Sequence, residues 1–357
     1  MRGASIGALG LALALAAGPA HAANEEHVRT PVLWPSECGR VVERAVEPTL
    51  TLTYDIPVED LELEDDELPD SRTHQFLAFC RQHPYTELLP PWITRSDVER
   101  SVDAGLIEPD SVTYREILDE STIWTDCFTR ITPDQPRRPI SFEVAEAGVV
   151  WDTTSLATGV WSVSGYTFEP HLNLWSDRPG FIKILDDRND PDQDLPALGL
   201  VGTEQVVEVH DPLVFEACAD FVGPGLVEFE WAALAPSLDW QPLASVELAE
   251  DETWTPELRA PEAAAGLEIL LRGRLTDALG RSYEAHAPTR ASVMACPDGG
   301  CPPPPSADPE PPDSRGAAEG CHLGGDSDPG ALPLMVLLGV MGLRMWPKLG
   351  RRRSFVG

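Results

Sequence analysis

Short runs in which every second residue is apolar recur along this chain, and they restrict its fold more than any other feature. Such runs occur at residues 49–54, 159–168 and 180–185, and residues 73–80 also have the character of a strand with an apolar face. Successive side chains of a β-strand point to opposite faces, so this pattern predicts strands with a buried face. We therefore expect a mainly β protein.

A second group of similar runs follows in the later part of the chain. It comprises residues 205–221, 225–231, 244–248, 267–276 and 282–286. Short strands at this spacing are typical of β-sandwiches. We expect two sandwich-like domains, at residues 23–187 and 201–296, joined by an acidic linker at 188–200.

The run at 159–168 has the sequence Gly-Val-Trp-Ser-Val-Ser-Gly-Tyr-Thr-Phe, and a Pro-Gly turn leads into the later run at 180–185. This arrangement is similar to the end of an immunoglobulin-like or fibronectin-like sandwich, over about 30 residues. The resemblance implies an all-β fold with two immunoglobulin-like β-sandwich domains.

A helical insertion is expected in the first domain, near residues 94–125. Ser96 followed three residues later by Glu99 has the pattern of a capping box, which predicts a helix from Asp97 to Ala104. Gly105 would end this helix. Residues 111–120 could form a second short helix. Strand signals then return, and we expect strands at 140–144 and 149–151.

The chain begins with the features of a secretory signal peptide. Arg2 precedes an apolar run at 6–17, and small residues at Ala20 and Ala22 complete a cleavage site, which predicts cleavage after Ala22. The alternative is an N-terminal membrane anchor, for which the run is short. We therefore expect the body of the protein outside the cytoplasm.

In an exported chain, cysteines predict disulfide bonds. The candidates in the body are Cys38, Cys80, Cys127, Cys218, Cys296 and Cys301. Six cysteines allow 15 pairings, and the sequence does not choose among them. Cys296 and Cys301 could pair with each other, or each could hold a strand to the body. The seventh cysteine, Cys321, belongs to the C-terminal region.

That C-terminal region predicts a stalk and an anchor. Residues 297–320 are rich in proline and poor in large apolar side chains, so we expect a disordered, extended stalk. Cys321 then precedes a mostly apolar stretch at 331–350, which is long enough for a transmembrane helix despite Arg344. A basic cluster at 351–353 follows, and positive charge favours the cytoplasmic side.

This order of cysteine, glycine-containing spacer, apolar helix and arginine cluster resembles the MYXO-CTERM sorting signal of myxobacterial surface proteins, over residues 318–353. The resemblance implies that a sorting protease processes the segment 321–357 near Cys321, that lipid can be attached there, and that the protein is delivered to the cell surface or outer membrane. The alternative is a plain membrane anchor with Cys321 in a disulfide bond.

The formal charge of −33 disfavours nucleic acid as a partner and could attract calcium. The weak calcium candidates are Asp186, Asp187, Asp190, Asp192 and Asp194. Their alternation resembles a calcium loop, although Leu195 stands where an EF-hand needs glycine. The alternative is a solvated acidic linker, and no other cofactor is expected.

Catalytic signatures such as G-x-S-x-G or H-E-x-x-H are absent, so no catalytic residue is predicted. The histidines of the mature body are scattered singly and are expected at the surface or as caps: His27, His74, His83, His171, His210 and His286. A pocket with convergent histidine, carboxylate and hydroxyl groups would favour an enzyme.

Aromatic residues cluster around the strongest strand region and allow two interpretations. They are Trp151, Trp161, Tyr166, Phe168 and Trp175. They could form a sandwich core, which we expect, or an exposed row that stacks on sugars.

Taken together, the sequence predicts an exported, cell-surface-anchored, non-enzymatic protein with a display, adhesion or envelope-structural role. The alternatives are a secreted hydrolase and a calcium-dependent binding module. No feature of the sequence names an extracellular ligand.

Overall fold

The computed structural model describes residues 29–63, 65, 67–84, 87–134, 137–170, 172–296 and 300–301. Strands dominate this part of the chain, with two α-helices and four short 3-10 helices among them. The prediction of a mainly β protein is confirmed. The predicted signal peptide, its cleavage site at Ala22, nearly all of the stalk, and the segment with Cys321 lie outside the described residues.

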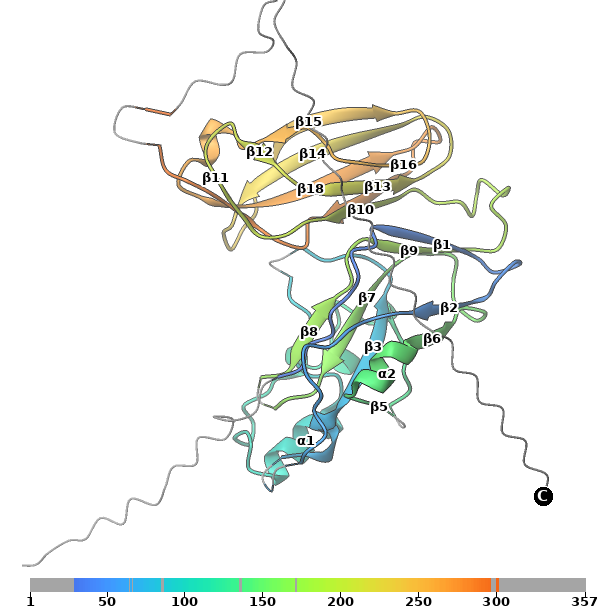
Figure 1. The fold of residues 1–357 in the computed structure, drawn as a ribbon, viewed down its shortest axis with the longest axis vertical. Helices are drawn as coiled ribbons and strands as arrows, with labels where there is room; N and C mark the ends of the chain where they lie inside the picture. The colour runs from blue at the N-terminus through green and yellow to red at the C-terminus, as the bar shows by residue number, and fades with distance from the viewer. Residues whose placement is uncertain are drawn as a thin grey trace, which may run out of the picture. The chain divides into compact units, whose positions relative to one another are not determined.

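One sheet organises the first half of the protein, which contains the elements β1 to β9 (Figure 1). Its strand order is β1 (Gly39–Glu43), β9 (Phe181–Leu185), β7 (Gly159–Thr167), β3 (Thr73–Phe79) and β4 (Phe128–Arg130). Two further strands join it, β5 (Arg138–Pro139) beside β3 and β8 (Leu174–Asp177) beside β7. Strand β1 is parallel to β9, whereas the other neighbours are antiparallel.

Both faces of this sheet are covered. In β3, Phe76 and Ala78 belong to one buried cluster, and Leu77 and Phe79 belong to another. The antiparallel pair of β2 (Thr49–Leu52) and β6 (Val149–Asp152) contributes to the first cluster. The helical insertion contributes to the second cluster. Because side chains alternate along a strand, the four consecutive apolar residues 76–79 of β3 need cover on both sides of the sheet.

The insertion contains α1 (Arg95–Asp103) and two 3-10 helices, η2 (Tyr114–Glu116) and η3 (Leu118–Glu120). The predicted N-cap at Ser96 is wrong, because Thr94 caps the helix. The Thr94 hydroxyl accepts a hydrogen bond from the Asp97 amide at 3.1 Å, and the Asp97 carboxylate accepts one from the Thr94 amide at 3.3 Å. Thr94 and Asp97 therefore form the capping box, two residues before the pair Ser96 and Glu99 that the sequence suggested.

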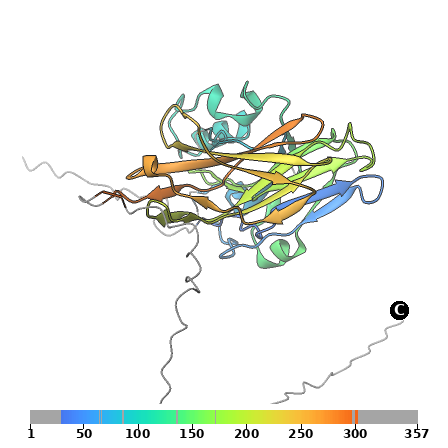
Figure 2. The same ribbon diagram turned by 90° about the horizontal axis from the view of Figure 1, so that it is seen from above.

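The predicted strand at 140–144 is also wrong. Ser141 caps α2 (Phe142–Ala147) through a hydrogen bond from the Val144 amide to its hydroxyl at 3.3 Å. Gly148 ends this helix with a φ of 65°. Ala145 of α2 packs in the first cluster, so α2 and the insertion lie on opposite sides of the sheet (Figure 2).

The second half contains the elements β10 to β20. Its larger sheet has the order β11 (Gln205–Val207), β20 (Ala291–Val293), β18 (Glu268–Thr276), β14 (Gly225–Ala233) and β15 (Gln241–Leu248), with β19 (Ser282–His286) beside β18. The smaller sheet has the order β10 (Ala197–Val201), β13 (Glu216–Asp220) and β16 (Glu252–Trp254). A third pair joins β12 (Pro212–Leu213) to β17 (Leu258–Arg259), and η4 (Glu262–Ala264) precedes β18.

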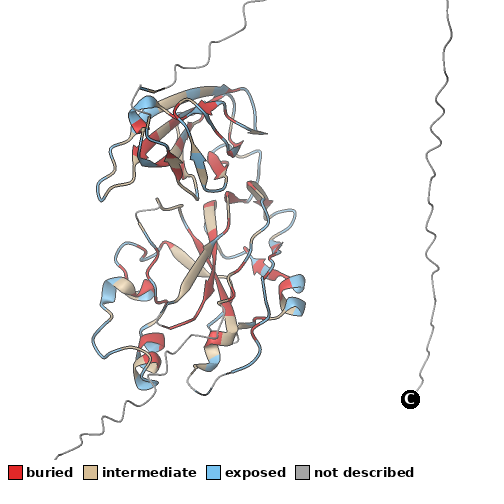
Figure 3. Ribbon diagram, turned by 60° about the vertical axis from the view of Figure 1, so that its left-hand side comes forward, coloured by how far each residue is buried: buried red, intermediate tan, exposed pale blue. Residues whose placement is uncertain are grey.

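A single buried cluster lies between the sheets of the second half. It takes Leu198 and Ala217 from the smaller sheet and Val227, Phe229 and Leu271 from the larger one. Strand β14 alternates between buried and more exposed residues over its first six positions, as the sequence predicted. Figure 3 shows buried positions along the strands and exposed ones on the outer surface of the helices. This layering is that of a β-sandwich.

The predicted linker at 188–200 is wrong in its last part, because β10 begins at Ala197 and is buried. The segment is a short, wholly apolar run, which is the pattern of a strand covered on both faces. Only the turn before it, at 186–196, matches an acidic connection.

Strands β1 and β9 lie beside β13 and β10 at the junction of the halves (Figure 1). A small buried cluster joins them there, and a disulfide bond between Cys38 and Cys218 runs through it. The Cys38 carbonyl also accepts a hydrogen bond from the Phe181 amide at 3.0 Å. The described residues accordingly belong to one compact unit.

Two further disulfide bonds pair Cys80 with Cys127 and Cys296 with Cys301. The prediction of disulfide bonds in the body is confirmed, and of the two alternatives for Cys296 and Cys301 the structure has the local loop. All six candidate cysteines are thus paired.

Candidate functional site

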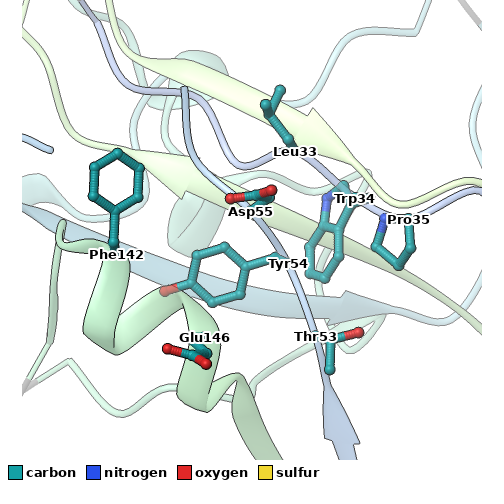
Figure 4. Close-up of a pocket in the computed structure, with 8 residues that line it drawn as sticks. All are labelled: Leu33, Trp34, Pro35, Thr53, Tyr54, Asp55, Phe142 and Glu146. Atoms are coloured by element: carbon teal, nitrogen blue, oxygen red, sulfur yellow. The ribbon is translucent and has the colours of Figure 1, made fainter. Parts of the chain in front are cut away.

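A pocket of about 630 Å³ opens at the side of the first half (Figure 4). It is lined by Leu33, Trp34, Pro35, Thr53, Tyr54, Asp55, Phe142 and Glu146. These residues come from the segment before β1, the segment after β2, and α2. The pocket therefore combines three parts of the chain that are far apart in sequence.

Backbone pairing fixes two sides of the pocket. The Leu33 amide donates to the Asp55 carbonyl at 2.8 Å, and the Asp55 amide donates to the Leu33 carbonyl at 2.8 Å. Helix α2 supplies the third side. Phe142 and Glu146 are four residues apart on that helix, so both lie on the same face.

Two of the three aromatic rings are held rigidly. Tyr54 is buried against Phe76 with 4.9 Å between ring centroids, and Trp34 lies 5.7 Å from the same ring. The Trp34 indole donates a hydrogen bond to the Ser176 carbonyl at 2.7 Å. By contrast, Phe142 has 51% of its surface exposed. A ligand would meet preformed walls and one accessible ring.

The charge of the pocket is negative. Asp55 and Glu146 supply two carboxylates, and no lysine, arginine or histidine is among the lining residues. Burial raises the pKa of Tyr54 above its usual value, an effect that nearby Arg138 opposes, so the phenol stays neutral at neutral pH. Figure 4 shows the Tyr54 hydroxyl directed toward α2. Such a site suits a group with positive charge and an apolar surface.

A smaller cleft of about 190 Å³, lined by both apolar and polar residues, lies at the junction of the halves. Its lining includes His83, Ser164, Asp177 and His286. This is a convergence of histidine, carboxylate and hydroxyl groups, the pattern that would favour an enzyme. The order of the contacts, however, differs from that of a catalytic triad.

In the cleft, Asp177 lies between the serine and the histidine. The Ser164 hydroxyl donates to one Asp177 oxygen at 2.6 Å, and His83 Nε2 lies 3.6 Å from the other. A serine nucleophile needs the histidine, not the carboxylate, to remove its proton. Ser164 is also buried, with 2% of its surface exposed. This arrangement does not activate the hydroxyl.

Other polar groups of the cleft join the two halves. The Gln82 side chain donates to the Gly180 carbonyl at 2.9 Å and accepts from the His286 amide at 3.0 Å. A hydrogen bond with His286 lowers the pKa of Glu284 to about 2, and the charge of Arg272 also favours the carboxylate. The Gln82 contacts stabilise the junction, whereas the Glu284 contacts lie within the second half.

The calcium candidates are not brought together. Asp186 pairs with Arg44 at 2.6 Å, Asp187 accepts hydrogen bonds from Asn189, and Asp194 is buried. Asp190 and Asp192 lie in the same turn, where the Asp192 amide donates to the Asp190 carboxylate at 3.0 Å. Within the described residues, no group of three or more histidine, cysteine, aspartate or glutamate side chains could hold a metal ion.

The expectation of surface histidines fails for His74, which is completely buried. Its Nε2 donates to the Thr30 carbonyl at 2.8 Å, because a carbonyl can only accept. Burial lowers the pKa of His74 to about 4, so the ring is neutral at neutral pH. His27 and His171 lie outside the described residues.

The aromatic cluster of the strong strand region is a core. Trp151 is buried in the first cluster with Trp161 packed against it, whereas Tyr166 and Phe168 are buried in the second cluster with Trp175 packed against it. Ring contacts join Trp151 to Trp161 and Tyr166 to Trp175. The alternative of an exposed row for sugars therefore does not hold.

Sequence reasoning missed the aromatic pocket, since its rings come from segments with no shared motif. It also missed the environment of Lys183, although a signal was present. Only two lysines occur in the chain, and Lys183 interrupts the apolar run Phe-Ile-Lys-Ile-Leu. A lysine inside a buried strand needs a partner.

No family model matches the chain, and no curated protein matches it. Among solved structures, a chain described under "Structural basis for Dscam isoform specificity" is similar at 8% identity, with a TM-score of 0.17. The similarity covers 74% of this chain and 46% of that chain, so this chain spans less than half of that protein's length. At that TM-score the likeness carries no argument about fold or function.

The membrane prediction is not tested by the described helices. None of them has the length and apolar character needed to cross a bilayer. The predicted transmembrane segment at 331–350 lies outside the described residues.

Proposed function

We propose that this chain is an exported protein, anchored at the cell surface, with a non-enzymatic role in display or adhesion. Its two halves would be immunoglobulin-like sandwiches. The disulfide bonds support export, since such bonds persist in oxidising surroundings. The observation that carries the binding role is the open aromatic pocket with two carboxylates.

The ligand that fits this pocket best carries an organic cation, such as an ammonium or guanidinium group on a partner. Aromatic faces attract cations, and the neighbouring carboxylates add a favourable charge. An anionic ligand would meet the like charges of Asp55 and Glu146, and the cation beside the pocket, Arg138, is engaged with Tyr54. The strongly acidic composition of the chain acts in the same direction.

A secreted hydrolase is the rival, and its site would be the cleft at the junction of the halves. The Ser164 hydroxyl donates to Asp177 there and not to a histidine, so the serine–histidine contact of a hydrolase triad is not formed. The calcium-dependent alternative has no group of ligands among the described residues. These observations favour the binding role.

Binding of tetramethylammonium and of arginine amide, followed by NMR shifts of the Trp34 indole, tests the pocket. We expect saturable binding that weakens at high salt. Phe142→Ala should weaken it about fivefold, which corresponds to about 1 kcal/mol for a partly exposed cation–π contact. Glu146→Gln should weaken it by a similar factor, because one of the two charges is lost.

Two control variants lie outside the pocket. Glu143→Gln removes a charge from the same helix, and Tyr114→Ala removes an exposed ring from the insertion. Both should bind as the unchanged protein does. A neutral compound of the same shape, neopentyl alcohol, should bind more weakly than tetramethylammonium. Equal binding by all variants, or by the neutral compound, would contradict the proposal.

The intact mass of protein purified from the cell surface tests the anchor. We expect a chain that begins at Ala23 and either ends near Gly320 or carries lipid on Cys321. A Cys321→Ser variant should accumulate in an unprocessed form. The other six cysteines are paired with one another, so none of them offers a thiol that could replace Cys321. An unmodified surface chain running to Gly357 would rule the sorting signal out.

A further inference from the structure

Lys183 occupies an environment in which a charged side chain is costly. It lies in the middle of β9, and its side chain is fully buried. Its neighbours across the sheet are Val41 on β1 and Val160 on β7. Water is therefore excluded from the ammonium group, whose charge must be balanced within the protein.

Two buried aspartates surround the lysine amine. The Lys183 Nζ contacts Oδ1 of Asp194 and Oδ1 of Asp220, and each aspartate has only 6% of its surface exposed. Asp194 lies in the turn between β9 and β10, and Asp220 is the last residue of β13. Three separate elements thus bring an amine and two carboxyl groups into contact.

The two carboxyl groups have different surroundings. Oδ2 of Asp220 accepts a hydrogen bond from Arg188 at 2.7 Å, and Arg188 also pairs with Asp251 at 2.6 Å. The Asp220 carboxyl is therefore held by the lysine amine at one oxygen and by a guanidinium at the other. Among the described residues, the Asp194 carboxyl forms an ion pair with Lys183 alone. The backbone carbonyl of Asp194 accepts a hydrogen bond from the Arg281 side chain at 2.8 Å.

This difference assigns a role to each group. Condensation requires a neutral amine and a neutral acid, which differ from the buried ion pair by the transfer of one proton from the ammonium to the Asp194 carboxylate. The amine is then in contact with an electrophilic carboxyl carbon. Asp220, whose second oxygen is held by Arg188, is in contact with the same amine and can accept its proton.

We propose that Lys183 and Asp194 condense to an intramolecular amide, with Asp220 as the proton carrier. The Lys183 nitrogen forms a bond to Cγ of protonated Asp194 while Asp220 takes one proton from nitrogen. Asp220 then gives this proton to the departing hydroxyl, the C–OH bond breaks, and one water molecule leaves. The products are an amide and water, and Asp220 returns to its starting form.

The reaction needs no cofactor or oxidant, because the fold supplies the proximity. Holding two reactants in contact can replace a large part of the barrier of a bimolecular reaction. Exclusion of water also disfavours the reverse hydrolysis. The amide would close the turn between β9 and β10 beside the disulfide bond of Cys38 and Cys218.

Mass spectrometry of the reduced protein tests the proposal directly. We expect a mass lower by one water molecule than the sequence requires. Cleavage after glutamate distinguishes an amide to Asp194 from an amide to Asp220. Lys183 and Asp194 fall on peptide 170–204, whereas Asp220 falls on peptide 217–228. An amide to Asp194 makes peptide 170–204 lighter by one water. A full-mass peptide, or a cross-link between the two peptides, would overturn the proposal.

Variants test the role of each group. Lys183→Arg and Asp194→Ala should both restore the full mass. Asp220→Asn should keep the amine and Asp194 but slow the condensation, so that the full-mass form accumulates in protein whose circular dichroism shows the β fold. The matched control is Asp251→Asn, which alters the other partner of Arg188 and should leave the amide formed. Complete condensation in Asp220→Asn would refute the assigned proton carrier.

Discussion

Replacing Cys38 and Cys218 together by alanine is expected to lower the free energy of unfolding by about 5 kcal/mol. The disulfide bond closes a loop across a sequence separation of 180 residues, so removing it restores a large entropy to the unfolded chain. The two cysteines also belong to the buried cluster that joins the halves. Urea denaturation without reductant measures the effect.

The chain contains its own control for this result. Cys296 and Cys301 are separated by only 5 positions, so their replacement by alanine should cost about 2 kcal/mol or less. A cost for the distant pair no larger than that for the local pair would show that the junction does not depend on the long-range bond. The double variants avoid leaving a single free thiol in either case.

Gly180→Ala is expected to destabilise the protein by more than about 4 kcal/mol, or to prevent folding. The added Cβ would lie 1.6 Å from the Cys38 carbonyl oxygen, which is backbone and cannot rotate away. Gly180 also has a φ of 72°, which side chains disfavour. Relieving the overlap would separate β1 from β9 beside the disulfide bond. The yield of soluble protein and its urea midpoint measure the loss.

Gly105→Ala separates the effect of the steric overlap from the effect of the positive φ. Gly105 has nearly the same φ, 73°, but no atom would lie within 4 Å of an added Cβ. This variant should cost only the conformational penalty, about 1 kcal/mol. Similar losses for both variants would show that the close approach of Gly180 to Cys38 does not contribute to the stability of the junction.

Strands with one exposed face were predictable from the sequence, because alternation records burial directly. Strand β14 is an example, with Val227 and Phe229 inward and Glu228 outward. Strand β10 was not predicted, since a short apolar run has no period of its own. The strand expected at 140–144 failed because the capping role of Ser141 outweighs local strand propensity.

The candidate sites depended on contacts that no local pattern records. Trp34, Tyr54 and Phe142 share a pocket only because Leu33 pairs with Asp55 and α2 packs beside them. The contact of Lys183 with Asp220 likewise requires both halves to be folded. What the sequence did contain was the isolated lysine in an apolar strand, a sign of buried charge without its partners.

The pairing of β1 with β9 sets an order of events during synthesis. Strand β1 leaves the ribosome long before its parallel neighbour, and Cys38 emerges 180 residues ahead of Cys218. Chains emerge N-terminus first, so the edge of β1 must wait unpaired while the intervening strands appear. The thiol of Cys38 must wait as well. During this long interval the Cys38 thiol is free to form a non-native disulfide bond. A chaperone that covers β1, or a delayed supply of oxidant, would favour the native bond with Cys218.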